Sequence, residues 1–446
     1  MILPVAFALL AFRMLFALAL IPPWQQPDEH RHVALIELRK TQLTLLDGSI
    51  EPPLEREILQ SMVRYDWWEH RYAEQGRAVA PSIIPKDFDS APGVGGSDRN
   101  VASLPTYFFG VARLLSWLPP LSIVEDLYIL RAISAVFGML TLWVAWLGAR
   151  ECLGTLGGTT VALLLALHPQ FAIVSTAAAA DGLVNLLGAC MWWQTTVAVN
   201  RTHVLLPLAG VWCAAIAAAS ADRMGVPLLI VAFVVSVALV TLRRLSWGRK
   251  VMVALPATAV VAVVVLGAAM WTLASFGETY GLRDIFFQSW SLVPEAKTWD
   301  FFTRFTLFVH QSWWFSLGWV RYAPPSWWAG VALALTAIAA AGTAQRLFRD
   351  RALDPQTRML IALAVIGLAV QVSAVYWNFF RLGNGAQGKS LFPVLVPCLV
   401  LLWSGIETWV PKPHRVHAAA ALVLLFALLD AAVWGLVAFP AYSASL

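Results

Sequence analysis

The chain has 446 residues, of which 59% are hydrophobic and only 13% are charged, and its mean hydropathy is +0.69. Soluble proteins carry about 25% charged residues, so this composition excludes a protein whose whole surface faces water. The formal net charge of +5 does not indicate a nucleic-acid binder, because most basic residues stand in short segments between apolar runs.

Eleven apolar runs are long enough to cross a bilayer as helices, which takes about 17–25 residues. They are 2–21, 127–148, 156–175, 182–199, 203–219, 225–242, 251–274, 326–345, 358–378, 389–407 and 417–438. We therefore predict an all-α polytopic integral membrane protein with a single membrane domain over residues 1–446. The first run has no basic leader and no small-residue cleavage site, so we expect it to be retained as a span.

Lysine and arginine predict the orientation of these spans, because cytoplasmic loops are enriched in both. With the N-terminus inside, the short outer loops hold only Arg223, Arg381 and Lys389. The cytoplasmic loops then hold Arg150, Arg201, Arg243, Arg244, Arg249, Lys250, Arg346, Arg349, Arg351, Arg358, Lys412 and Arg415. This asymmetry predicts a cytoplasmic N-terminus and an external C-terminus.

Two long segments, 22–126 and 275–325, fall outside in this orientation. The first contains two amphipathic pieces, His32–Lys40 and Leu54–His70, and ends in an apolar stretch, Leu104–Leu118. That stretch is too short to span, so we expect it to lie at the membrane interface. The second segment is rich in tryptophan, which favours interfacial anchoring over sugar stacking for most of these side chains.

The first candidate site follows the first span directly, in the sequence Pro-Pro-Trp-Gln-Gln-Pro-Asp-Glu-His-Arg-His that ends at His32. Carboxylates next to the hydrocarbon are costly and often functional. Asp28 and Glu29 could equally cap a helix, where acids are favoured by the dipole. His32 falls four residues after Asp28, on the same helical face. The sequence leaves catalysis and capping evenly balanced.

Asp181 is the second candidate, at the predicted outer end between the third and fourth spans. It is either the N-cap of the fourth span or one half of a carboxylate site with Asp28. Such a pair suits a general base or a divalent cation. Asn185, one turn further on, would extend the polar face into the bundle.

The third candidate is an outer loop that leads into the tenth span, from Arg381 to Pro393. Its glycines flank Gln387 and precede Lys389, so backbone amides and an ammonium group could bind an anion together. The alternative is a flexible turn with a lysine that extends to the interface.

Six short motifs, including these three, follow one another in order along the chain. They are Gln26-Pro-Asp-Glu-His-Arg-His32, Leu104-Pro-Thr-Tyr-Phe108, Arg131, Asp181, Ser312-Trp-Trp-Phe-Ser-Leu-Gly-Trp319 and Gln387-Gly-Lys-Ser-Leu-Phe-Pro393. The ordered set resembles the class C (GT-C) membrane glycosyltransferases, most closely a bacterial family of predicted membrane proteins with Pro-Pro-Asp-Glu-x-x-His and Gln-Gly-Arg-Tyr motifs. The chain departs from that family at Gln26, where a second proline is usual, and at Lys389-Ser390, where Arg-Tyr is usual.

The resemblance implies an inverting glycosyltransferase of the bacterial inner membrane whose active site faces the periplasm. The donor would be a polyprenyl-phosphate sugar, and the acceptor a cell-envelope glycan, lipid or protein. Asp28 would be the general base, with Glu29 and Asp181 as supporting carboxylates and His32 orienting them. Asp28 and Asp181 could also hold a divalent cation, Mg²⁺ or Mn²⁺, and the sequence leaves the need for a metal open. The implied substrate-binding residues are Lys389, Gln387, Arg381, Arg321, Tyr107 and Trp319.

Three other functions compete with this one. A lipid or sugar transporter or flippase predicts charges within spans, and Arg13 in the first span fits it better than an enzyme. Acids that cluster in long outer segments favour the enzyme. A non-catalytic subunit of envelope assembly would use Asp28 and Glu29 only as a cap. A ligase of the O-antigen type would rely on outer arginine and histidine without an acid pair after the first span.

Overall fold

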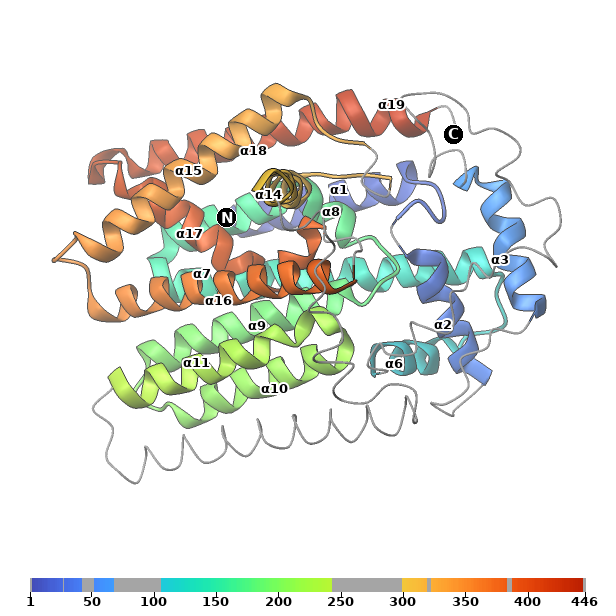
Figure 1. Ribbon diagram of the computed structural model, residues 1–446, viewed down its shortest axis with the longest axis horizontal. Helices are drawn as coiled ribbons and strands as arrows, with labels where there is room; N and C mark the ends of the chain where they lie inside the picture. Colours follow the sequence, from blue (N-terminus) through green and yellow to red (C-terminus); the bar gives the residue numbers. More distant parts are fainter. Residues whose placement is uncertain are drawn as a thin grey trace.

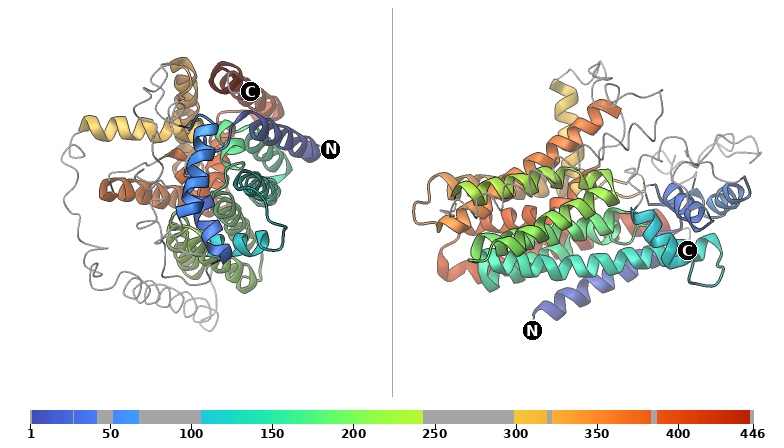
Figure 2. Two further views of the ribbon diagram at one scale, coloured as in Figure 1. Left: turned by 90° about the vertical axis from the view of Figure 1, so that its right-hand side faces the viewer. Right: turned by 90° about the horizontal axis from the view of Figure 1, so that it is seen from below.

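A computed structural model describes residues 2–26, 28–41, 52–67, 106–242, 299–318, 322–382 and 387–443. Within these ranges the regular structure is helical, and the only strand-like feature is an isolated bridge between Leu317 and Tyr322. Long helices run side by side in one bundle, and three shorter helices gather beyond one end of it (Figure 1). Figure 2 shows the same bundle from its end and from below.

The bundle and its end helices follow the predicted apolar and amphipathic pattern. The bundle contains α1 (Ile2–Leu20), α7 (Ile123–Leu167), α9 (Asp181–Asn200), α10 (Leu205–Ala221), α11 (Pro227–Leu242), α15 (Ser326–Phe348), α16 (Pro355–Leu382), α17 (Leu395–Thr408) and α18 (Arg415–Val433). The end helices are α2 (Glu29–Thr41), α3 (Pro52–Arg64) and α6 (Thr106–Leu115). Short elements complete the fold: α8 (Pro169–Val174), η2 (Arg223–Gly225), α14 (Trp299–Trp314), η5 (Gly388–Val394), η6 (Lys412–His414), η7 (Trp434–Ala438) and α19 (Phe439–Tyr442).

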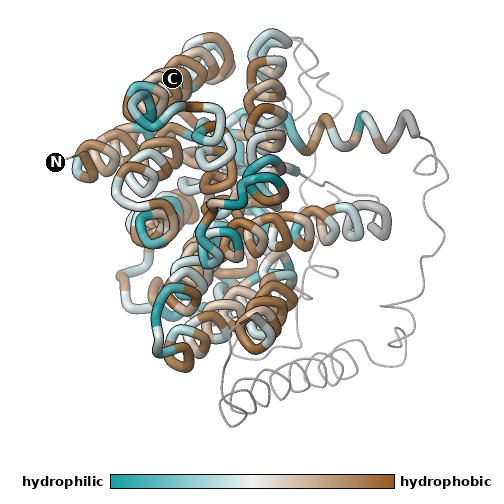
Figure 3. Tube along the Cα trace, turned by 90° about the vertical axis from the view of Figure 1, so that its left-hand side faces the viewer, coloured by the Kyte–Doolittle hydropathy of each residue, from teal (hydrophilic) through white to brown (hydrophobic). Residues whose placement is uncertain are grey.

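Seven of the described helical segments are long and apolar enough to cross a membrane. They are Ile2–Leu20, Ile123–Leu167, Arg223–Thr241, Ser326–Phe348, Pro355–Trp377, Gly388–Thr408 and Lys412–Tyr442. Apolar residues predominate along the helices of the bundle (Figure 3), and many large apolar side chains, Phe12, Leu206 and Leu428 among them, are exposed, as lipid contact requires. The all-helical fold is thus confirmed for the described residues, and the seven helices are consistent with a multi-pass membrane protein. The count of eleven spans stays a prediction, and the span at 251–274 lies outside the described residues.

The longest helix, α7, is two antiparallel helices joined at Gly154. Gly154 has φ +73° and ψ −175°, which are not helical values. A Cβ on Gly158 would lie 2.9 Å from the Cα of Arg150, whereas eight residues of straight helix would separate these positions by about 12 Å. Further from the turn, Gly138 lies against Ser175 in the same way. The predicted spans 127–148 and 156–175 therefore correspond to separate limbs of a hairpin.

Arg13 has a structural role within the bundle. It is 5% exposed, and its guanidinium donates hydrogen bonds to the backbone carbonyls of Ala166 and His168, where α7 ends and α8 begins. It also forms an ion pair with Asp430 of α18, which accepts a further bond from Trp434 Nε1. A helix break inside a membrane frees carbonyls that need partners. Arg13 supplies those partners, so its charge is explained without a transported substrate.

The described parts of the segment 22–126 agree with its amphipathic pattern. The stretch His32–Lys40 lies within α2, and Leu54–His70 begins as α3. The apolar tail contains α6, whose ten residues are too few to span a bilayer.

Candidate active site

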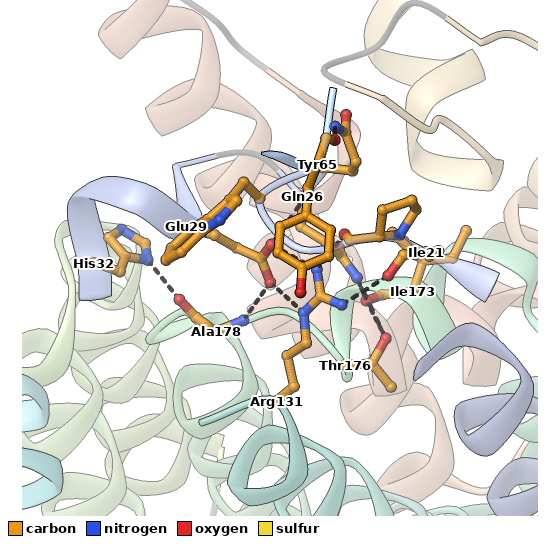
Figure 4. Close-up of polar contacts among 12 residues, drawn as sticks. Ile21, Gln26, Glu29, His32, Tyr65, Arg131, Ile173, Thr176 and Ala178 are labelled. Atoms are coloured by element: carbon orange, nitrogen blue, oxygen red, sulfur yellow. Dashed lines mark hydrogen bonds and ion pairs between the residues drawn. The ribbon is translucent and has the colours of Figure 1, made fainter. Parts of the chain in front are cut away.

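The candidate residues meet where the chain between α1 and α2, the start of α9 and the turn η5 come together at the end of the bundle that carries α2 and α6. Glu29 is at the centre of this junction and is fully buried. Arg131 of α7, itself 1% exposed, holds it through two parallel bonds: Nε to Oε1 at 2.8 Å and Nη2 to Oε2 at 2.7 Å (Figure 4). Such a bidentate pair is the strongest arrangement of these two groups.

Glu29 and Arg131 also form hydrogen bonds with backbone groups around them. Glu29 accepts the backbone N–H groups of Ala178 at 3.2 Å and Gln26 at 3.3 Å. Arg131 donates to the carbonyls of Ile21 and Pro22, at 2.8 and 2.9 Å. Glu29 therefore fastens the end of α1, α7 and the segment before α9 to one another. This geometry gives Glu29 a structural role and leaves it poorly placed as a metal ligand, while its supporting role in catalysis stays a prediction.

Asp28 differs from its neighbour in every respect. Its side chain is 39% exposed, and its nearest ionic contact is Arg31 at 3.7 Å. The amides of Arg31 and His32 bond to the Asp28 backbone carbonyl, and among the described residues none bonds to its carboxylate. Its φ of +66° is rare for a residue other than glycine. The carboxylate therefore caps no described amide of α2, and the residue has a backbone conformation that few residues other than glycine adopt.

Positive charge surrounds Asp28. Burial alone would raise the pKa of its carboxyl group, but Lys389, His32, Arg31 and His30 together hold that pKa below its ordinary value. The group is thus an ionised carboxylate at neutral pH. Because it has no close hydrogen-bond donor in the described structure, it can accept a proton or bind a hydroxyl group.

Asp181 and Lys389 form the second ion pair of the site, with Nζ 2.9 Å from Oδ2. Asp181 is the first residue of α9, and the N-cap is Ala180, so the capping alternative does not describe Asp181. Lys389 lies in η5, where Gly388 donates its N–H to Ser312 Oγ at 2.8 Å. A Cβ on Gly388 would lie 1.9 Å from the backbone N of Trp313. Glycine is therefore required for η5 to approach the end of α14.

The hydrogen bond of His32 goes to the segment before α9, and in the described structure none joins His32 to Asp28 or Glu29, so its predicted orienting role is limited to its charge near Asp28. Its Nδ1 lies 3.2 Å from the carbonyl oxygen of Ala178, and its ring contacts Phe108 at a centroid distance of 5.6 Å. The same Ala178 donates its N–H to Glu29. Glu29 and His32 thus hold both sides of one residue, three positions before Asp181.

Asp222 belongs to the same cluster, although it was not predicted as a site residue. It lies between α10 and η2, and its carboxylate accepts the Met224 N–H at 2.8 Å. Burial first, and then the charge of Asp181, raises the pKa of Asp222. The available signal was its position between adjacent apolar runs, on the same predicted side as Asp28 and Asp181.

The other predicted substrate-binding residues are divided between described and undescribed parts of the chain. Tyr107 is 2% exposed in α6, and burial raises the pKa of its hydroxyl group. Gln387 precedes η5 directly, and Asn185 is buried one turn into α9. Arg321, Trp319 and the side chain of Arg381 lie outside the described residues.

A small pocket opens beside the Asp181–Lys389 pair. Its volume is about 10 Å³, room for little more than one water molecule. Gln25, Gln170, Ile173 and Leu317 line it together with both members of the pair.

The predicted metal site does not fit the described side chains. Within the described ranges, no three His, Cys, Asp or Glu side chains are placed to share a metal ion. Asp181 is paired with Lys389, and Glu29 with Arg131. We therefore derive no step through a metal.

No protein-family model matches the chain, and no curated protein matches it significantly.

Proposed function

We propose that the chain is a membrane glycosyltransferase that moves a sugar from a polyprenyl-phosphate carrier to an acceptor hydroxyl on the non-cytoplasmic face, with inversion. The observation that carries the proposal is the ionised carboxylate of Asp28, which is 39% exposed, accepts no hydrogen bond from the described residues and lies within the electrostatic reach of Lys389. A base and a cation in one site are what this reaction needs, since one substrate oxygen loses a proton while another gains charge.

In the proposed step, the acceptor oxygen attacks the anomeric carbon from the face opposite the phosphate. The acceptor proton passes to Asp28 as the new C–O bond forms. The bond between the anomeric carbon and the phosphate oxygen breaks, and its electron pair stays on the phosphate. The ammonium group of Lys389 has three N–H donors, so it can stay on Asp181 and still bind the departing phosphate.

The surroundings support a lipid-linked donor. The site lies at one end of a bundle whose sides carry exposed apolar residues, including Phe12, Leu206 and Leu428. A polyprenyl tail can lie along such a surface while its phosphate reaches the end of the bundle. The ordered motifs quoted above support the same donor class.

Two observations weaken the transporter and scaffold interpretations. Arg13, the feature that favoured a transporter, is paired with Asp430 and backbone carbonyls. The scaffold interpretation required Asp28 to cap α2, and its carboxylate accepts no hydrogen bond from the described amides of that helix.

Transfer can be measured directly with protein in nanodiscs. The assay presents radiolabelled polyprenyl-phosphate hexoses and pentoses together with an envelope extract as acceptor. We expect label to move from at least one donor into acceptor and the new bond to have inverted stereochemistry. If no donor in the panel is consumed, while the label is merely redistributed across the bilayer of a proteoliposome, the transporter would be the better account.

The proposed orientation has its own test. Ser116 is exposed just after α6, and Ala352 is exposed between α15 and α16. Ser116→Cys should react with a membrane-impermeant thiol reagent in intact cells, and Ala352→Cys should react only after lysis. The reverse pattern would place the candidate site in the cytoplasm and contradict a periplasmic transferase.

A further inference from the structure

Gln371 of α16 joins two turns of the candidate site that are far apart in the sequence. Its side chain is fully buried, and its Nε2 group donates to the carbonyl of Met224 in η2 at 3.1 Å and to that of Ser390 in η5 at 2.8 Å. Because a carbonyl can only accept, the orientation of the amide is fixed. One amide therefore connects η2, which follows Asp222, to η5, which carries Lys389.

The sequence explains why these two carbonyls need a donor from another helix. In a 3₁₀ turn a carbonyl accepts the N–H of the residue three positions further along the chain. For Met224 that residue is Pro227, and for Ser390 it is Pro393. Proline has no backbone N–H, so both turns lack the same bond. Gln371 supplies a donor to each of them.

Lys389 lies between two anchored neighbours in η5. Gly388 donates its N–H to a serine hydroxyl of α14 at 2.8 Å, and Ser390 gives its carbonyl to Gln371 of α16. A lysine side chain has many rotamers, so the direction in which it leaves the backbone determines where its ammonium group can lie. Fixing both neighbours fixes that direction and favours the contact of Nζ with Asp181 at 2.9 Å.

We propose that Gln371 is a positioning residue: by clamping η2 to η5 it holds Lys389 against Asp181, where the donor phosphate leaves. The part of this inference that concerns the phosphate rests on the proposed function, whereas the clamp does not. Gln371 acts through the backbone of Ser390 and not by contact with substrate. A polar side chain within the candidate span Pro355–Trp377 is costly, and the clamp accounts for its presence.

The reactivity of Lys389 tests the clamp without any turnover. Full-length protein in nanodiscs is treated with a trace of acetic anhydride, and peptide mass spectrometry gives the acetylation of Lys389 relative to that of Lys412, which is exposed in η6. Gln371→Met keeps the length of the side chain and removes both donors. We expect it to raise this ratio roughly three- to tenfold, the effect of about one neutral hydrogen bond. Asp181→Asn gives the ratio for Lys389 without its ionic partner.

Two further variants separate positioning from a general loss of stability. Thr343→Val is isosteric and removes another buried bond from a side chain to a carbonyl, that of Thr343 Oγ1 to Leu401, so it should leave the ratio unchanged. Pro393→Ala, added to Gln371→Met, restores a backbone N–H three positions after Ser390 and should return the ratio toward the wild-type value. If Gln371→Met does not fold, Gln371→Asn takes its place, because its shorter side chain withdraws the amide from both carbonyls.

Three labelling results would overturn the inference: an unchanged ratio in Gln371→Met, an equal rise in Thr343→Val, or no recovery in the double variant. In transfer assays Gln371→Met should lower kcat about three- to tenfold with a smaller change in KM, because the charge of Lys389 is needed most as the phosphate leaves. Wild-type kinetics despite raised labelling would overturn the positioning role. Failure of the proposed function is distinct: raised labelling in a protein that transfers from no donor would leave the clamp without a transferase.

Discussion

The ammonium group of Lys389 lies 2.9 Å from the carboxylate of Asp181, although 208 positions separate the two residues in the chain. The contact brings together the start of α9 and the turn η5, which the sequence presents as separate features. It also places a cation beside Asp28, whose pKa it lowers. The phosphate-binding and base residues of the proposed reaction thus meet in one site.

Lys389 should contribute more to the transition state than to the ground state, because charge accumulates on the leaving phosphate. We expect Lys389→Gln to raise the KM for donor lipid and to lower kcat as well. Lys389→Arg should keep most activity, since arginine also binds phosphate. Lys412→Gln, in the distant turn η6, is the control. Steady-state kinetics with a titrated donor decide the matter, and identical kinetics for Lys389→Gln and the wild type would exclude Lys389 as the phosphate ligand.

Glu29 and Arg131 should contribute strongly to the stability of the folded protein. Removing one partner of a buried ion pair leaves an unpaired charge and costs about 3–5 kcal/mol. Glu29→Gln and Arg131→Met should therefore lower the thermal unfolding midpoint in detergent and the yield of monodisperse protein. The control is Arg201→Ala, which removes an ion pair with Glu151 whose arginine side chain is 62% exposed and should cost about 0–1 kcal/mol. If Glu29→Gln is as stable as Arg201→Ala but inactive, Glu29 is catalytic and its structural assignment is wrong.

The sequence predicted the helical membrane fold because lipid imposes a strong and simple pattern on every span. It also indicated the break near Gly154, since the apolar runs on either side are separated by charged and small residues. It could not predict the Glu29–Arg131 pair, because neither residue's neighbours in sequence reveal a partner more than 100 positions away. The motif resemblance marked both residues without joining them.

Asp222 is another site residue that was not predicted from the sequence. Its carboxylate binds the Met224 N–H, and Met224 in turn presents its carbonyl to Gln371, which also bonds to Ser390. Asp222 follows α10 and Asp181 begins α9, and the packing of these two helices on each other places the two acids close together. A local pattern distinguishes such an acid poorly from an ordinary cap of a short turn.

The effects of substituting Arg13 and Asp430 on stability should be coupled, because the two side chains form a buried ion pair. Arg13→Met alone leaves an unpaired carboxylate in the bundle, and Asp430→Leu alone leaves an unpaired guanidinium, so each should reduce the unfolding midpoint strongly. The double variant should recover part of that loss, although the carbonyls at the α7–α8 break still lose their donor. Thermal unfolding of the four proteins gives the coupling energy. Strictly additive losses would show that the pair is not a unit.

Glu37 should make stability depend on pH near neutrality. Burial raises the pKa of Glu37 from 4.5 to about 7, while Lys40 lowers it and Asp126 raises it further. A raised carboxyl pKa contributes stability below the unfolded value, and this contribution disappears as pH rises through the folded one. Unfolding midpoints should thus fall between about pH 4.5 and 7 in the wild type. Glu37→Gln should flatten this part of the profile, and Glu55→Gln should not. An unchanged profile in Glu37→Gln would assign the titration to another group.

In the proposed mechanism the carboxylate of Asp28 removes the acceptor proton, and replacing it with an amide should abolish this step. Asp66 is a second aspartate with positive φ, at +51°, and it is exposed at the end of α3, so Asp66→Asn is a matched control for the backbone. In single-turnover transfer with saturating donor lipid, Asp28→Asn should fold normally and lose about 10²- to 10⁴-fold in rate, the usual contribution of a general base. Asp66→Asn should react as the wild type does. Wild-type transfer by a correctly folded Asp28→Asn would contradict the proposed mechanism.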